Sequence, residues 1–193
     1  MSTLAAELSR HARAVIAEAL GGPRASDPPA EARRKGAAFV TLRFRQGRLQ
    51  GCIGTLEAQR SLAEDVRRNA LAAAFDDPRA RPLTLADLAD LDVEVSLLSP
   101  LEPVEFHDEP SALAALRPGV DGVVLSALGR RGTFLPQMWR ELREPRRFLD
   151  ELKQKAGFSP RFWSDDVRLE RYTVDEHVDR AGGPEALAKR AAS

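Results

Sequence analysis

AAFVTLRFRQGRLQGCIGTLE, residues 37–57, is the stretch that decides the fold. Side chains in 37–44 alternate with the period of two that is typical of a β-strand; one set is Phe39, Thr41 and Arg43, and the other is Val40, Leu42 and Phe44. Gly47 follows in the turn RQGR, and a second extended segment covers 49–57. Because glycine accepts the positive φ of a tight turn, the pattern predicts a β-hairpin bent at Gly47.

The second strand of this hairpin carries Cys52, the only cysteine among 193 residues. Strand alternation places Cys52 on one face with Gln50 and Gly54, and Gly51 on the opposite face with Ile53. Glycines inside a strand mark a bulge or a close backbone approach, including approach by a ligand. Cys52 is therefore either a small buried side chain, which the local sequence favours, or a reactive thiol in a shaped site.

The remaining segments mix helices with extended runs. We expect helices over 4–19, over 62–75 behind a Ser61 cap, in a short stretch after Thr84, and over 145–157 with Pro145 in the first turn. Strands are expected over 91–106, with Pro100 and Pro103 breaking the far end, and over 166–178. A second hairpin is expected over 121–136, and a short helix or turn over 110–119. This order favours an α+β fold with a largely antiparallel β-sheet flanked by helices.

Composition excludes several classes of protein. Lys+Arg and Asp+Glu both total 29, so the net charge is zero, and nothing in the balance indicates a nucleic-acid or anionic-membrane partner. No apolar run approaches the roughly 20 residues that span a bilayer, and charges interrupt the first 22 residues, unlike a secretory signal. A single cysteine allows no intramolecular disulfide and no multi-cysteine metal site. We expect a cytoplasmic protein without a membrane segment.

Histidines offer little support for catalysis. His11, His107 and His177 are far apart in the chain and form no metal-binding spacing. None is linked by a motif to Cys52, so the sequence identifies no base for that thiol. We expect no metal site and no cofactor.

Two clusters of charge are more informative. Arg130 and Arg131 lie between glycines at the predicted second bend, where a guanidinium could face a carboxylate or phosphate, or simply the solvent. Asp76, Asp77 and Arg79 follow the helix over 62–75 and fit either a site or a network that orders the loop.

Five blocks in order resemble the AMMECR domain family, and more closely its bacterial and archaeal branch, component A of the AmmeMemoRadiSam system. They are GAAFVTLRFRQGRLQGCIG, NALAAAFDDPRARPL, LDVEVSLLSPLEPVEF, DGVVLSALGRRGTFLPQMW and FLDELKQKAG…FW, and the resemblance covers roughly residues 4–178. It implies an α+β fold with a larger sheet part, a smaller lobe and a groove between them. We therefore expect one AMMECR-like domain over 1–180 and a flexible tail over 181–193.

The resemblance also implies site residues. The family's hallmark reads LRGCIG, whereas residues 49–54 read LQGCIG, so Gln50 stands where the family usually has an arginine and a charge near Cys52 is lost. Cys52 is the candidate catalytic residue. The expected lining of a substrate or partner groove is Gln50, Gly51, Gly54, Asp76, Arg79, Arg131, Gly132 and Thr133.

The sequence leaves two classes of function open. The resemblance implies work beside a Memo-like protein, similar to metal-dependent dioxygenases, and a radical SAM enzyme. The favoured function is a groove-bearing binding or accessory component of a modification pathway, because the thiol lacks a base and the neighbouring charge. The alternative is a small thiol-dependent enzyme that uses Cys52 as nucleophile or carrier on an anionic substrate, oriented by Arg131 and Thr133. Whether the chain is an enzyme, and its oligomeric state, stay open.

Overall fold

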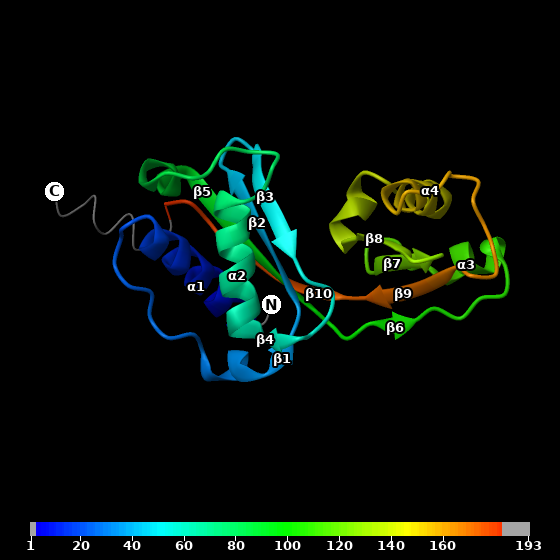
Figure 1. The fold of residues 1–193 in the computed structure, drawn as a ribbon, viewed down its shortest axis with the longest axis horizontal. Helices are drawn as coiled ribbons and strands as arrows, with labels where there is room; N and C mark the ends of the chain where they lie inside the picture. Colours follow the sequence, from blue (N-terminus) through cyan, green and yellow to red (C-terminus); the bar gives the residue numbers. More distant parts are fainter. Residues whose placement is uncertain (1–2, 183–193) are drawn as a thin grey trace. The chain divides into compact units, whose positions relative to one another are not determined.

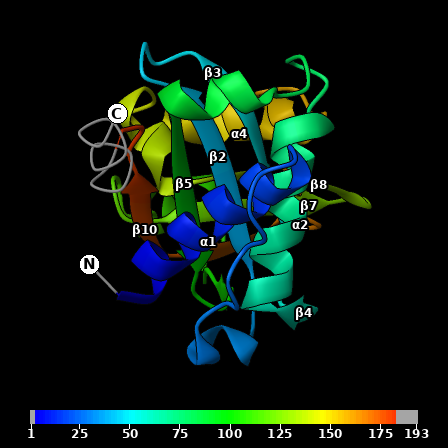
Figure 2. The ribbon, with the colours of Figure 1, turned by 90° about the vertical axis from the view of Figure 1, so that its left-hand side faces the viewer.

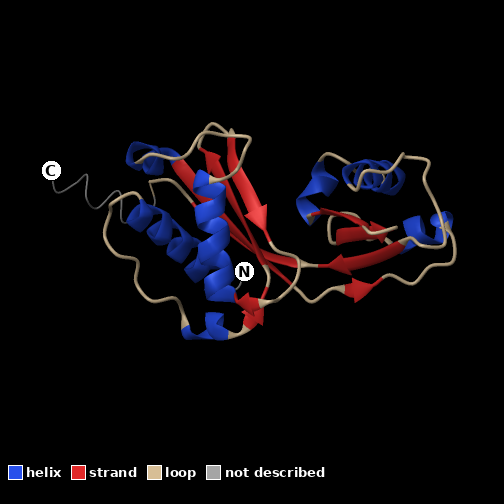
Figure 3. Cartoon of the chain, viewed as in Figure 1, coloured by secondary structure: helices blue, strands red, loops and turns tan. Residues whose placement is uncertain are grey.

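A computed structural model describes residues 3–182, which divide into two compact units. Unit 1 contains the described residues up to Leu98 and those from Asp175 onward, and unit 2 is Ser99–Val174. Each unit combines helices with an antiparallel β-sheet (Figure 3). The α+β fold class predicted from the sequence is confirmed.

The sheet of unit 1 has four strands in the order β10-β5-β2-β3. Their bounds are β2 Ala38–Phe44, β3 Leu49–Gly54, β5 Leu91–Leu98 and β10 Val174–Asp179. Strand β2 pairs antiparallel with both β3 and β5. The predicted hairpin is present, with Gly47 at a φ of 83° in its turn. Strand β3 forms one edge of the sheet.

Two helices, α1 (Thr3–Ala19) and α2 (Leu62–Phe75), cover one face of this sheet (Figure 2). The Ser61 hydroxyl accepts a hydrogen bond from the Glu64 N–H, as the capping pattern predicts. Both helices pack apolar side chains on the sheet; the contributions of the sheet to this core are Ala38, Val40, Leu42, Leu91, Val93, Val95 and Leu97. Smaller elements complete the unit: η1 (Ala30–Arg33), β1 (Lys35–Gly36), β4 (Arg60–Ser61) and η2 (Leu85–Asp90).

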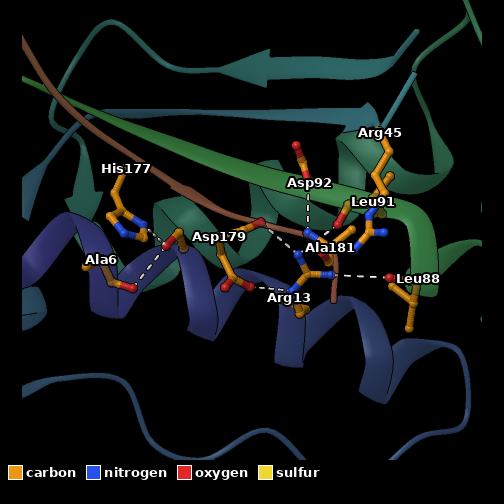
Figure 4. A network of polar contacts seen from close by, with 10 residues as sticks. Ala6, Arg13, Arg45, Leu88, Leu91, Asp92, His177, Asp179 and Ala181 are labelled. Atoms are coloured by element: carbon orange, nitrogen blue, oxygen red, sulfur yellow. Dashed lines mark hydrogen bonds and ion pairs between the residues drawn. The ribbon is translucent and has the colours of Figure 1, made fainter. Parts of the chain in front are cut away.

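Strand β10 returns to unit 1 from the far end of the chain and is fixed to α1 by polar contacts (Figure 4). Arg13 forms an ion pair with Asp179 and donates to the Leu91 carbonyl at 2.7 Å. Ser9 is hydrogen-bonded to Nδ1 of His177 at 2.8 Å. These buried or half-buried contacts stabilise a strand that is separated from α1 by more than 150 residues.

Unit 2 contains the second sheet, in the order β6-β9-β7-β8 (Figure 1). Its strands are β6 Glu102–Pro103, β7 Gly122–Ala127, β8 Arg130–Phe134 and β9 Arg168–Tyr172, and its helices are α3 Glu109–Ala115, η3 Pro136–Arg140 and α4 Pro145–Lys155. Trp139 and Phe148 stack in the core with ring centroids 3.8 Å apart. Lys153 is fully buried and donates to the Pro160 carbonyl and to Glu109. The second predicted hairpin and the helix that begins at Pro145 are confirmed.

The strands predicted over 91–106 and 166–178 were each wrong in extent. Each run is divided between the two sheets, because β5 and β10 belong to unit 1 whereas β6 and β9 belong to unit 2. The breaks fall at Ser99 and Thr173, which are hydrogen-bonded to each other in both directions at 3.0 Å. Pro100 and Pro103 indicate the first break, but strand periodicity does not say which sheet a segment joins.

Part of the tail predicted over 181–193 is described. The Ala181 N–H donates to Asp92 at 2.7 Å. Residues 183–193 lie outside the described residues. Of the helices within 3–182, none combines the length and apolar character needed to cross a bilayer.

Candidate functional site

Cys52 lies on edge strand β3, directly across from Thr41 of β2. The Thr41 hydroxyl donates a hydrogen bond to the sulfur at 3.2 Å. Thr41 is buried and Cys52 is half-buried. Since Val40 and Leu42 point into the helix-covered core, Thr41 and Cys52 share the opposite face of the sheet.

The backbone of Cys52 points to the open edge of the sheet, where the turn after α2 binds it. The Asp77 carboxylate accepts the Cys52 N–H at 3.0 Å, and the Arg79 guanidinium donates to the Cys52 carbonyl at 3.3 Å. Unpaired edge groups invite pairing with other chains. Asp77 and Arg79 therefore form a clamp that covers this edge at Cys52.

The clamp is held together by a close ion pair. The Asp77 carboxylate accepts three hydrogen bonds from Arg79: from Nη2 at 2.6 Å, from Nε at 2.9 Å and from the backbone N–H of Arg79 at 3.1 Å. The Asp77 side chain is 2% exposed, whereas that of Arg79 is 58% exposed. Hydrogen bonding from Arg79 holds the pKa of Asp77 far below its ordinary range; burial opposes this shift and the Cys52 N–H adds to it. Asp77 in turn raises the pKa of Arg79.

We expect the free energy of unfolding of Asp77→Asn to depend less on pH, at acid pH, than that of wild type. Because the pKa of Asp77 is lowered on folding, its stabilisation is complete above the unfolded value of about 4 and is lost as the pH falls further. Wild type should therefore be more stable than Asp77→Asn at pH 7, with a gap that narrows below about pH 4. Urea unfolding between pH 7 and pH 2.5 measures this gap.

Asp76→Asn is the matched control, because Asp76 is exposed at the end of α2. Its unfolding curves should follow those of wild type at every pH. A gap between wild type and Asp77→Asn that stays constant or widens toward low pH would contradict the clamp's electrostatics.

The two glycines of the hallmark accommodate close packing within unit 1. A Cβ on Gly51 would lie 2.2 Å from the Ala73 carbonyl oxygen of α2. A Cβ on Gly54 would lie 2.2 Å from the ring of Phe39. The close approach predicted from these glycines is thus made by the chain's own helix and by a neighbouring aromatic ring.

The other groups that could serve a thiol are engaged elsewhere. Among residues 3–182 the polar contacts of Cys52 come from Thr41, Asp77 and Arg79. His177 is bonded to Ser9, and burial lowers the pKa of His11. Across the same residues, no three His, Cys, Asp or Glu side chains gather as ligands for a metal ion.

Comparison with known proteins shows the family to which this chain belongs. The family model described as AMMECR1 matches residues 9–177, which is most of the chain. The chain belongs to the AMMECR1 family. A protein of Thermotoga maritima is 39% identical over 156 residues, covering 80% of this chain and 84% of the relative. Another, from Methanothermobacter thermautotrophicus, is 36% identical over 171 residues, covering 86% and 88%. The crystal structure of the uncharacterized protein PH0010 from Pyrococcus horikoshii superposes with a TM-score of 0.85 at 31% identity, covering 95% of this chain and 96% of that one.

Gln50, where this AMMECR1 chain departs from the hallmark, lies at a β-bulge. Pairing with β2 passes from Leu42↔Gly51 to Arg43↔Leu49, which leaves Gln50 as an extra residue. The bulge interrupts the alternation expected between Gln50 and Cys52. Gln50 is buried, and its Nε2 donates to the Arg81 carbonyl at 2.6 Å. Its Oε1 has no hydrogen-bond partner among the described residues.

The remaining predicted site residues of the AMMECR1 chain belong to unit 2. Arg131, Gly132 and Thr133 lie on β8, so the clamp at Cys52 is built from unit 1 alone. Nη2 of Arg131 lies 3.4 Å from Oε2 of Glu170 on β9. Thr133 Oγ1 donates to the Val123 carbonyl at 3.0 Å. The first contact spans β7, which lies between β8 and β9, and the second joins the neighbouring strands β8 and β7.

Sequence reasoning missed two residues at Cys52. The alternating pattern places Thr41 only on a strand, and the sequence puts Asp77 in a charged cluster whose expected site residue is Asp76. The structure brings Asp77 against Cys52 and leaves Asp76 exposed. The signal for Asp77 was the Asp-Pro-Arg turn itself, which allows the carboxylate to accept from its own chain two residues later.

Proposed function

We propose that this AMMECR1-family chain is a binding or accessory component that acts in the cytoplasm with a Memo-like protein and a radical SAM enzyme. The observation that carries the proposal is the use of the polar groups at Cys52. Asp77 and Arg79 bind each other and the strand backbone, and the third polar neighbour, Thr41, is a hydroxyl. A nucleophilic cysteine needs a base or a cation at the sulfur. The Arg79 guanidinium interacts electrostatically with Cys52, but its hydrogen bonds go to the Asp77 carboxylate and to the Cys52 carbonyl.

A rigid sheet edge suits a binding role. The clamp satisfies the edge groups at Cys52, and the glycines on either side permit close packing against Ala73 and Phe39. A surface fixed in this way loses little conformational entropy when a partner binds, which favours affinity. In this binding role the Cys52 side chain contributes its size and shape to the surface at the edge of β3.

One contact favours the alternative of a thiol-dependent enzyme. The Thr41 hydroxyl donates to the Cys52 sulfur at 3.2 Å and so fixes the position of the sulfur on the face of the sheet opposite the helices. In that case Cys52 would be the nucleophile or carrier, and replacement of its sulfur would abolish the function.

The test mixes the purified chain with the purified Memo-like and radical SAM proteins of the same organism, one at a time and together. Size-exclusion chromatography with light scattering reports the mass of any complex. We expect a complex with at least one partner, retained by Cys52→Ser. Absence of a complex under all conditions would overturn the proposal, and loss of the complex in Cys52→Ser alone would favour the thiol alternative.

A further inference from the structure

A segment without regular structure, residues 22–29, joins α1 to η1 in unit 1, and we call it the strap. It runs along the outer side of α1 and α2, away from the sheet (Figure 2). Three of its residues are prolines, and none of its residues is buried. Residues 23–28 form no backbone–backbone hydrogen bond with any described residue. The strap therefore depends on side chains for its attachment to the helices.

Two side chains of α1 make this attachment. Oε2 of Glu18 accepts a hydrogen bond from the Ala25 N–H at 3.3 Å, and the His11 ring is hydrogen-bonded to the backbone of Ser26. Oε2 of Glu18 also lies 3.8 Å from Nη1 of Arg67 on α2. Both helices and the strap therefore meet around His11.

One nitrogen of the His11 ring is enclosed. Nδ1 is buried and has no hydrogen-bond partner among the described residues. A neutral imidazole carries a hydrogen on one nitrogen, whereas the imidazolium carries one on each. Protonation would therefore leave a buried N–H donor at His11 without an acceptor, which is unfavourable. The closed strap thus favours the neutral ring.

The charges that face His11 come from all three elements. Burial and the Arg67 cation on α2 lower the pKa of His11, and together they outweigh the Ser26 hydrogen bond and the carboxylates of Asp27 in the strap and Glu18 on α1. With the strap detached, the ring would be solvated and its pKa would return to about 6.5. The open strap therefore binds the proton more tightly than the closed strap. The closed form is fully favoured above about pH 6.5 and loses stability as the pH falls through the lowered pKa.

We infer that residues 22–29 are a pH-sensitive strap, closed on α1 and α2 while His11 is neutral and detached when His11 binds a proton. This regulation goes beyond the proposed function and does not depend on it. A segment with few buried contacts opens at a lower free energy than the core, so the strap can detach while the sheet and its helices stay folded. Opening exposes the side of α1 and α2 around His11, which links that surface to pH.

An NMR titration of the full chain from pH 8 to pH 5 tests the inference, because the carboxylates stay largely charged over this range. The ring signals of His11 report its protonation, and ¹⁵N relaxation reports the order of the strap amides of residues 24–27. We expect His11 to titrate below pH 6.5. The order parameters of the strap amides should fall from about 0.85 to below about 0.6 as the ring is protonated.

The variant His11→Gln keeps a polar side chain that does not titrate, so its strap should stay ordered down to pH 5. His107→Gln is the matched control, because His107 is exposed in unit 2, and its strap should lose order with acid as in wild type. A wild-type strap that stays ordered while His11 is protonated overturns the inference, as does the same loss of order in His11→Gln. If His11→Gln does not fold, wild type alone decides. Equal midpoints for the His11 ring and the strap amides support the inference, and unequal midpoints, or a His11 midpoint at or above pH 6.5, overturn it.

Discussion

Asp65→Ala is expected to lower the free energy of unfolding by about 3–5 kcal/mol, because it leaves the half-buried Arg60 guanidinium and several buried donors without their acceptor. Asp65 is fully buried on α2. Its Oδ2 accepts from the Ala38 N–H at 3.0 Å and from Asn69 at 3.1 Å, and its Oδ1 accepts from Arg60 at 2.8 Å. The Thr55 hydroxyl also donates to Oδ2. One carboxylate therefore joins α2 to the start of β2 and to the segment after β3.

Urea unfolding followed by circular dichroism measures this loss. Arg68→Ala is the control on the same helix, because the Arg68 side chain is exposed and should contribute less than about 0.5 kcal/mol. A loss below about 1 kcal/mol for Asp65→Ala would show that water replaces the carboxylate and that the network is not closed.

Gly51→Ala is expected to destabilise the chain by about 3 kcal/mol, at the upper end of the usual range for overpacking. The added methyl would lie 2.2 Å from the Ala73 carbonyl oxygen and 3.1 Å from the Ala73 Cα, which are both backbone atoms of α2. No side-chain rotation relieves such a contact, so the helix or the edge strand must move. The same urea titration measures the effect.

The control variant Gly47→Ala separates the effect of steric crowding from the effect of backbone strain. Gly47 has a φ of 83°, but a Cβ there would meet no atom within 4 Å. Its substitution should cost only about 1 kcal/mol, which is the conformational penalty. Equal losses for the two variants would refute the close approach of α2 to Gly51.

Local signals made parts of the fold predictable from the sequence. Helix α2 begins after Ser61 as expected, because the cap is a contact between residues three apart. The first hairpin bends at Gly47 for a similar reason, since a positive φ at a turn is a requirement of the turn itself. Neither depends on residues far along the chain.

The pairing of Cys52 could not be predicted in this way. Counting back from the pair Arg43↔Leu49 without a bulge would place Val40 opposite Cys52. The extra residue at Gln50 shifts the register by one and brings Thr41 there instead. The bulge depends on how β3 packs between β2, α2 and the 77–82 segment, so no local pattern reveals it.

The Asp-Pro-Arg turn indicates that Asp77 binds its own chain, but it does not indicate that Asp77, and not Asp76, meets Cys52. Asp76 and Asp77 carry the same side chain, and the direction in which the chain leaves α2 decides which one meets the edge of β3. In unit 2 the sequence pointed to Arg130 and Arg131 at the second bend, whereas the side chain at the tip is Leu128. A leucine in a two-residue turn contradicts turn preferences, so its place there follows from the strand pairing and not from propensity.

We propose that the chain works by binding and that Cys52 serves the structure of the β3 edge. A titration of wild type and Cys52→Ser against the same purified partner, by isothermal calorimetry under reducing conditions, tests it most directly. We expect dissociation constants that agree within about threefold, because serine fits the space of cysteine and leaves the backbone contacts to Asp77 and Arg79 in place. A dissociation constant weakened more than about tenfold in Cys52→Ser, with an unchanged melting temperature, would contradict it.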